Sequence, residues 1–208
     1  MGLIKSISFD QDELLNWMIR LYVPKGAFDA DVTYSTGGFY RSGVIPRPAL
    51  CFDLNPLCEG VVRADCRRLP IASCTLDSLI LDPPFLATKG PSLAGMQGNI
   101  INRRFGVYPT EAALAEMYRD ALREARRVLK PGGILVFKCQ DKVSSGKQYM
   151  MHCDVRAWAE QVGFVVEDLL ILLARSRLVA NWQRNQKHAR KYHSYFWVFR
   201  KRERREVP

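Results

Sequence analysis

Long hydrophobic runs, paired cysteines and internal repeats are all missing from this 208-residue sequence. No apolar stretch approaches the roughly 18 residues that a membrane-spanning helix needs, so no membrane partner is expected. The N-terminus lacks a basic region followed by an apolar core and a small-residue cleavage site, which predicts a cytoplasmic protein. The six cysteines form no C-x-x-C pair and no zinc-like spacing with histidine, so we expect free thiols and no metal.

The composition that remains is typical of one soluble globular domain. Apolar residues make up 48% of the chain and charged residues 25%. The length suffices for one substantial core, and we predict a single domain over residues 1–208. Within it we expect a helical segment at 1–27, a long loop at 86–109 and a basic tail at 200–208.

Positive charge is concentrated near the C-terminus. The formal net charge is +10, and residues 175–208 hold eleven basic residues against two glutamates. Between residues 182 and 199 the cations are interleaved with aromatic side chains, a mixture that suits phosphates and unstacked bases. This pattern predicts a nucleic-acid partner, with a solvated basic tail as the alternative for residues 200–205. The cations assigned to nucleic acid in this region are Arg184, Lys187, Arg190 and Lys191. The long loop at 86–109 adds Arg103 and Arg104 as candidates for contacts with flanking phosphates, with a surface loop as the alternative.

The most informative motif follows an apolar run that predicts a buried strand. Residues 79–81 lead directly into Asp82-Pro83-Pro84-Phe85. Asp82 supplies a carboxylate acceptor, the two prolines have no N–H and present fixed carbonyls, and Phe85 supplies a flat face for stacking. Because ligands of open α/β sheets bind at the carboxyl ends of strands, this position favours a site for a planar amine. The alternative is a stiff turn that ends the strand.

Hydrophobic periodicity predicts strands and helices in alternation. The expected helices span residues 10–22, 110–129 and 155–162, with Asp10 and Thr110 as capping residues of the first two. The expected strands span residues 28–33, 50–53, 61–65, 75–81, 134–137, 164–174 and 194–200. This order predicts an α/β three-layer sandwich around a mostly parallel, seven-stranded sheet with one antiparallel strand near the C-terminus.

Taken together, these residues resemble the amino-methyltransferases, which use S-adenosylmethionine to methylate exocyclic amines of adenine or cytosine in DNA. The resemblance covers about residues 28–199, and its most specific element is the run 79–85, which matches the family's catalytic tetrapeptide. Residues 125–135 are similar to the helix-to-strand junction of many methyltransferases, and residues 138–141 and 188–195 look like compact phage-type members. The resemblance implies a Rossmann-like methyltransferase fold with S-adenosylmethionine as cofactor.

The resemblance also implies a cofactor site. Residues 31–38 stand where the family carries an acidic residue and a glycine-rich turn beside the methionine portion of the cofactor, with Ser35 in place of the first glycine. Asp53 is expected to bind the ribose hydroxyls, with an Asx turn as the alternative. Asp65 is expected to bind the adenine amine, with a surface ion pair to a following arginine as the alternative. The implied cofactor-binding residues are Asp31, Thr33, Tyr34, Ser35, Gly37, Asp53, Leu54, Asp65, Cys66 and Asp82.

For catalysis, the resemblance implies that Asp82 and the Pro83 carbonyl hold the target amine while Pro84 and Phe85 complete the pocket. Adenine N6 is favoured because the cytosine enzymes more often begin this tetrapeptide with serine. Alternatives are methylation of cytosine N4, of an RNA base or of protein glutamine, and a nucleic-acid-binding module without catalysis. The chain has little room for a separate recognition domain, so the long loop, the basic C-terminus or a partner would read the target.

Overall fold

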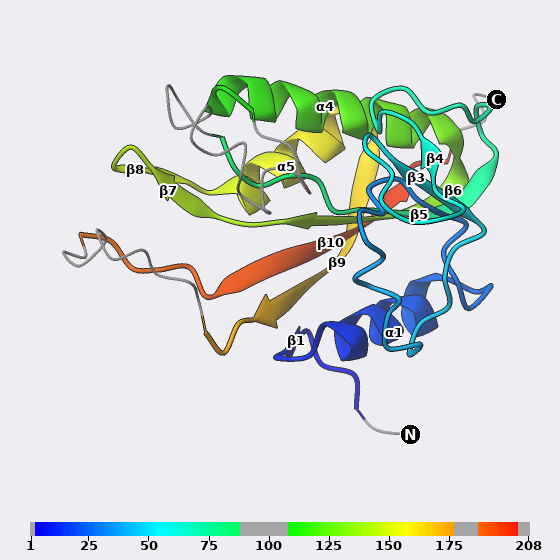
Figure 1. Ribbon diagram of the computed structural model, residues 1–208, viewed down its shortest axis with the longest axis horizontal. Helices are drawn as coiled ribbons and strands as arrows, with labels where there is room; N and C mark the ends of the chain where they lie inside the picture. The colour runs from blue at the N-terminus through cyan, green and yellow to red at the C-terminus, as the bar shows by residue number, and fades with distance from the viewer. Residues whose placement is uncertain (1–2, 88–107, 177–186, 204–208) are drawn as a thin grey trace.

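The structure, a computed structural model, describes residues 3–87, 108–176 and 187–203. Its centre is an eight-stranded sheet (Figure 1). In spatial order the strands are β1 (Ile7–Ser8), β9 (Phe164–Leu173), β10 (His193–Lys201), β6 (Leu129–Cys139), β5 (Leu76–Leu81), β2 (Ala30–Asp31), β3 (Leu50–Asp53) and β4 (Val62–Arg63). Strand β10 runs antiparallel to both of its neighbours, and the other pairings in this sheet are parallel.

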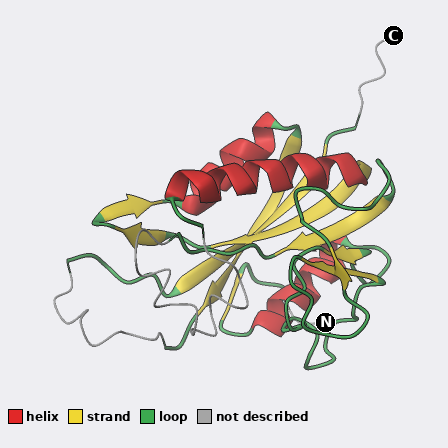
Figure 2. Cartoon of the chain, turned by 45° about the horizontal axis from the view of Figure 1, so that its top comes forward, coloured by secondary structure: helices red, strands yellow, loops and turns green. Residues whose placement is uncertain are grey.

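Helices cover both faces of the sheet. Helices α4 (Glu111–Val128) and α5 (Met151–Gln161) lie on one face, and α1 (Gln11–Tyr22) lies on the other (Figures 1 and 2). The arrangement confirms the predicted three-layer α/β sandwich with a mostly parallel sheet and a late antiparallel strand. Among the described residues, none of the helices combines the length and the apolar character needed to cross a bilayer.

The two long helices begin at the predicted capping residues. The Asp10 carboxylate accepts from the backbone N–H groups of Asp12 and Glu13, and the Thr110 hydroxyl accepts from that of Ala113. Side-chain caps of this kind satisfy N–H groups that have no partner within the helix. The local sequence therefore determines where α1 and α4 begin, one on each face of the sheet.

Strand β6 separates the two halves of the core by simple alternation. Leu135 and Phe137 pack in the cluster beneath α4 and α5, whereas Ile134 and Val136 pack in the cluster against α1. Successive side chains of a strand point to opposite faces, so one apolar run serves both layers. Strand β5 follows the same rule, with Ile80 facing α1.

Several features differ from the sequence-based expectation. Helix α5 begins at Met151 rather than residue 155, and β2 has two residues where a strand over 28–33 was expected. The sheet has eight strands rather than seven, because the two-residue β1 adds to the edge beside β9. Strand β6 begins at Leu129 rather than residue 134, and residues 130–133 bulge between its pairings with β5. A separate hairpin, β7 (Lys142–Ser144) and β8 (Lys147–Tyr149), follows β6. Strands β1, β7 and β8 have only two or three residues each, which is too short for periodicity to reveal them.

Candidate active site

The register of the sheet brings an acidic and a basic side chain together where the parallel strands end, which we call the carboxyl edge of the sheet. Leu81 pairs with Phe137, so the next residues of the two strands, Asp82 and Lys138, are neighbours. Lys138 Nζ lies 3.1 Å from Asp82 Oδ2, and their side chains are 12% and 19% exposed. Burial raises the pKa of the Asp82 carboxyl above its usual range, while the charge and hydrogen bond of Lys138 act in the opposite direction.

Two carbonyl groups of the tetrapeptide accept hydrogen bonds from neighbouring elements. Tyr118 of α4 donates its hydroxyl to the Pro84 carbonyl at 2.8 Å, and Lys142 of β7 donates to the Phe85 carbonyl at 2.7 Å. No hydrogen bond from a described residue occupies the Pro83 carbonyl. The Asp82 backbone N–H donates to Thr33 Oγ1 at 2.7 Å, which ties the tetrapeptide to the end of β2.

Asp31, the last residue of β2, is buried beside this edge. Its carboxylate accepts from the Thr33 backbone N–H at 2.9 Å and from the Tyr40 hydroxyl at 2.8 Å. Burial raises the pKa of Asp31 to about 7, although both hydrogen bonds lower it. The Tyr40 ring stacks on Tyr34 with the ring centres 5.4 Å apart. Asp31 is therefore a buried acid that titrates near neutral pH.

The glycine-rich turn adopts left-handed backbone at two positions. Ser35 has φ +52°, a conformation that favours glycine, and it stands where the resemblance expects glycine. Gly37 has φ +67°, and a Cβ added there would lie 2.7 Å from the Tyr34 hydroxyl, so only glycine fits. Ser35 Oγ is buried and has no hydrogen-bond partner among the described residues.

A cavity of about 170 Å³ joins the turn to the tetrapeptide. Its walls include Asp31, Thr33, Ser35, Asp82 and Lys138. With Tyr34, five predicted site residues thus meet around one space, and Lys138 joins them. Of the tetrapeptide, only Asp82 lines this cavity. The cavity also carries carboxylates on two neighbouring strand ends, which is where open α/β sheets bind ligands. Among the described residues, no group of three or more His, Cys, Asp or Glu side chains could hold a metal ion.

Asp53 lies next to the turn, at the end of β3. Its Oδ2 accepts from the Ser35 backbone N–H at 2.7 Å, and its Oδ1 accepts from the Asn55 backbone N–H at 2.8 Å. The second contact is the Asx turn that the sequence offered as an alternative role. Both carboxylate oxygens still have free lone pairs. The following residue, Leu54, is 51% exposed and stands open to contact.

Asp65 is bound to an arginine. The Arg67 guanidinium donates to both Asp65 oxygens at 2.6 to 3.1 Å, and Asp65 and Arg67 line a surface hollow apart from the cavity at Asp82. This is the surface ion pair offered as the alternative to adenine binding. Burial raises the pKa of the neighbouring Cys66 thiol to about 12. An adenine-binding role for Asp65 and Cys66 stays a prediction.

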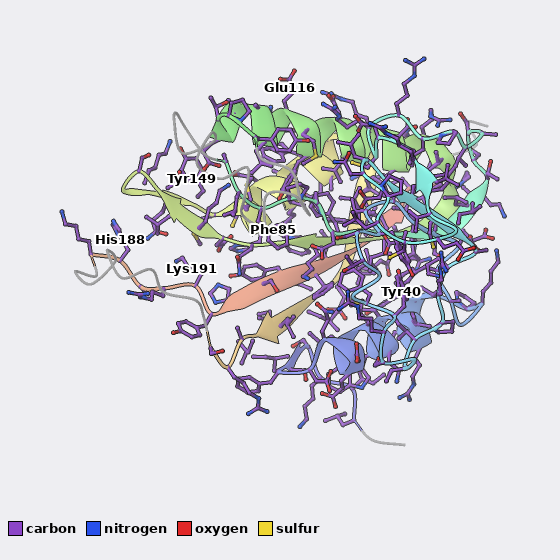
Figure 3. The ribbon with its side chains drawn as sticks, viewed as in Figure 1. Tyr40, Phe85, Glu116, Tyr149, His188 and Lys191 are labelled. Atoms are coloured by element: carbon purple, nitrogen blue, oxygen red, sulfur yellow. The ribbon has the colours of Figure 1, made fainter. Side chains whose placement is uncertain are left out.

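The predicted nucleic-acid residues divide into two groups. Lys187, Arg190 and Lys191 precede β10, whose first residues lie at the carboxyl end of β6 because the two strands are antiparallel. The Gln140 side chain donates to the His193 carbonyl at 3.1 Å, which fixes that neighbourhood. Figure 3 labels Lys191 and Phe85 in this part of the molecule. Arg103, Arg104 and Arg184 lie outside the described residues.

The sequence did not predict a role in the site for Lys138, Tyr40 or Gln11. Lys138 follows the apolar run of β6 as Asp82 follows that of β5, and this parallel was the signal available. Tyr40 and Gln11 carry no such signal, because the Tyr40 contact with Asp31 and the Gln11 contact with Lys138 depend on loop and helix packing.

No protein-family model and no curated protein sequence matches the chain. Solved structures do. The [4+2]-cyclase SpnF is 18% identical and superposes with a TM-score of 0.58 over 92% of this chain and 80% of its own. An S-adenosylmethionine-dependent methyltransferase from Methanosarcina mazei is 9% identical, with a TM-score of 0.52 over 89% of this chain and 97% of its own. These two likenesses show that the chain has the Rossmann-like methyltransferase fold.

A third solved structure is a candidate DNA modification methylase from Thermus thermophilus in complex with S-adenosyl-L-methionine. It is 23% identical, with a TM-score of 0.44 over 69% of this chain. The present chain spans 56% of the length of that methylase.

Proposed function

We propose that the chain transfers a methyl group from S-adenosylmethionine to the exocyclic amine of a nucleobase in DNA, with adenine N6 as the first choice. The observation that carries this proposal is the cavity of about 170 Å³ between Asp82 and the glycine-rich turn. One side of it presents the Asp82 carboxylate, which can accept from an amine, and the other presents a turn suited to a cofactor. In this proposal one domain, residues 1–208, carries the activity.

The residues around the cavity fit this cofactor. The ammonium of its methionine portion would face the Asp31 carboxylate, and the methionine carboxylate would accept from Ser35 Oγ, the buried hydroxyl without a partner among the described residues. Thr33, Tyr34 and Gly37 would shape this end of the site. Farther along, Asp53 would hold the ribose hydroxyls.

The adenine of the cofactor would lie against the exposed Leu54 side chain. Asp65 and Cys66 would stand at its edge. Asp65 can accept the adenine amine only by sharing its carboxylate with Arg67. We therefore expect Asp65 to contribute less to cofactor binding than Asp53.

When bound, the cofactor supplies a methyl group on a sulfonium sulfur. Asp82 and the Pro83 carbonyl accept the two N–H groups of the target amine, so the nitrogen lone pair points toward that methyl group. These acceptors would stabilise the positive charge that develops on nitrogen as the N–C bond forms and the bond from the methyl carbon to sulfur breaks, which would leave a neutral thioether. Fixing the nitrogen in line with the methyl group removes much of the entropic barrier. The nitrogen would then release one proton, which the hydrogen-bonded Asp82 carboxylate could accept.

Nucleic acid would approach over the carboxyl edge of the sheet. Lys187, Arg190 and Lys191 stand there to neutralise phosphates, and Phe85 offers a face for the target base. A base inside a duplex cannot reach Asp82, so it must be flipped out or already single-stranded. DNA is the favoured substrate through the family resemblance.

The test is incubation with tritiated S-adenosylmethionine and matched duplex DNA, single-stranded DNA and RNA, followed by nucleoside analysis. The expected product is N6-methyladenine in DNA. Label in cytosine or in RNA would replace the proposed substrate. Absence of label in every nucleic acid, together with no heat of cofactor binding in calorimetry, would reduce the chain to a binding module.

A further inference from the structure

The Lys138 side chain places a largely buried ammonium group at the centre of the site, with 12% of the side chain exposed. Its Nζ donates to Asp82 Oδ2 and to Gln11 Oε1, each at 3.1 Å. Three aromatic rings face the same nitrogen: Phe39 at 5.0 Å, Phe85 at 5.9 Å and Phe196 at 5.3 Å from their ring centres. Burying a charge is costly unless it is paired, and rings contribute to stabilising a cation. The surroundings of Lys138 therefore supply both a counter-ion and a cation-binding cage.

Other ionisable groups around Asp82 do not favour its charge. Asp31 approaches it from β2, Tyr118 from α4 and Cys139 from β6, and each has its own pKa raised by the Asp82 charge. Helix α1 contributes only the uncharged Gln11 to this spot. Among the described residues, Lys138 is the cation paired with Asp82. The anion thus depends on one partner.

The bond to Lys138 also differentiates the two oxygens of Asp82. Oδ2 is engaged by the ammonium, so Oδ1 is the oxygen left to accept from a ligand in the cavity. An ionised carboxylate only accepts hydrogen bonds, whereas a protonated one also donates. The ionised form therefore suits a target amine that must keep its lone pair toward the methyl donor, because it cannot donate a hydrogen bond to that lone pair.

We propose that Lys138 is the positioning residue of this site: it keeps Asp82 ionised and turns its Oδ1 toward the target amine. The inference rests on the proposed function and deepens it. Gln11 holds the ammonium from the opposite side, so α1 takes part in aligning the carboxylate. A competing view is that the Lys138 bond only fastens α1 and β5 to β6.

The deciding experiment is a titration of the Asp82 carboxyl by carbon-13 NMR in the whole chain. The variants are Lys138→Met, Lys138→Arg and the control Lys130→Met, which removes the Lys130–Asp77 pair at the other end of the same two strands. We expect the midpoint for Asp82 to rise by roughly 1 to 3 pH units in Lys138→Met. It should stay near the wild-type value in Lys138→Arg and Lys130→Met. An unchanged midpoint in a folded Lys138→Met protein would overturn the inference.

Methyl-transfer rates measured against pH separate this inference from the proposed function. The acidic limb of the profile should move to higher pH in Lys138→Met, and Lys138→Arg should restore it. In a protein that already carries Asp82→Asn, adding Lys138→Met should lower the methyl-transfer rate little further, because the carboxylate that Lys138 positions is absent. Equal costs of Lys138→Met in both backgrounds would support the fastening role instead. If the wild-type chain methylates no nucleic acid, the proposed function fails while the NMR titration still tests Lys138.

Discussion

Two lysine–aspartate pairs join strands β5 and β6 at opposite ends. At the carboxyl edge, Lys138 and Asp82 are 12% and 19% exposed. At the amino edge, Lys130 and Asp77 are 44% and 41% exposed, and Asp77 also binds Lys25 at 2.6 Å. An exposed pair contributes about 0 to 1 kcal/mol to stability, whereas a buried pair must offset a large desolvation cost. The same residue types therefore act as surface stabilisers at one edge and as candidate machinery at the other.

The sharpest test of this contrast is to remove each acid. Asp82→Ala should lower methyl transfer by about 100- to 1000-fold, because the developing charge on the amine loses its acceptor. Cofactor affinity, measured by calorimetry, should stay within a few-fold. Asp77→Ala is the matched control and should leave methyl transfer unchanged. Normal turnover in the Asp82 variant would remove the catalytic assignment.

Substitution of Asp53 tests whether the cofactor also binds at the carboxyl edge of the sheet. Asp53→Ala should weaken S-adenosylmethionine binding by about 10- to 100-fold, since hydrogen bonds to a charged group contribute about 1.5 to 3 kcal/mol. Calorimetry gives the affinity directly. Asp65→Ala should have a smaller effect, because Arg67 already occupies that carboxylate. A greater weakening in the Asp65 variant would reverse the two roles.

The pKa of Asp31, about 7, predicts two effects of pH. The folded state holds a proton that the unfolded state releases near pH 4, so the free energy of unfolding should fall as pH rises from about 4 to 7. Cofactor affinity should instead rise about tenfold from pH 6 to pH 8, because the cationic cofactor needs the ionised carboxylate. Calorimetry and urea unfolding measure both, and Asp31→Asn should remove both trends. A flat wild-type response would contradict the buried, protonated Asp31.

The smallest effect is expected for the cations that would face nucleic acid. Replacing Lys187 and Lys191 together with alanine should weaken DNA binding roughly a few-fold and lower its salt dependence by about 0.9 for each phosphate that is no longer neutralised. Fluorescence anisotropy across a salt series measures both. The control is the double alanine variant at Lys25 and Lys130, which removes equal charge from the amino edge. Equal loss of DNA affinity in the two variants would mean that binding depends on net charge and not on the position of these lysines.

The sequence predicted those parts of the fold that depend on local patterns. Caps at Asp10 and Thr110 and apolar stripes marked the helices, and an apolar run ending in Asp82 marked the strand that carries the tetrapeptide. In each case the signal and the structure it specifies lie within one segment. Patterns of this length are the most reliable that a single sequence offers.

The features that escaped prediction depend on contacts between distant segments. Lys138 becomes part of the site only through the register of β6 against β5. Tyr40 reaches Asp31 only because the turn after β2 folds back on itself. Strand β1 has two residues, and it pairs with a strand more than 150 positions later in the chain. Periodicity carries no information about such pairings.

Helix α1 contributes to the wall of the cavity at Asp82 as well as to the core. Gln11 in its first turn binds a residue 127 positions later in the chain, while Leu14 and Met18 are fully buried against the sheet. A shortened protein beginning near residue 28 would uncover an apolar sheet face and open the cavity at Asp82 to bulk water. A purification tag or surface tether attached ahead of Met1 would lie only ten positions from Gln11, which lines that cavity.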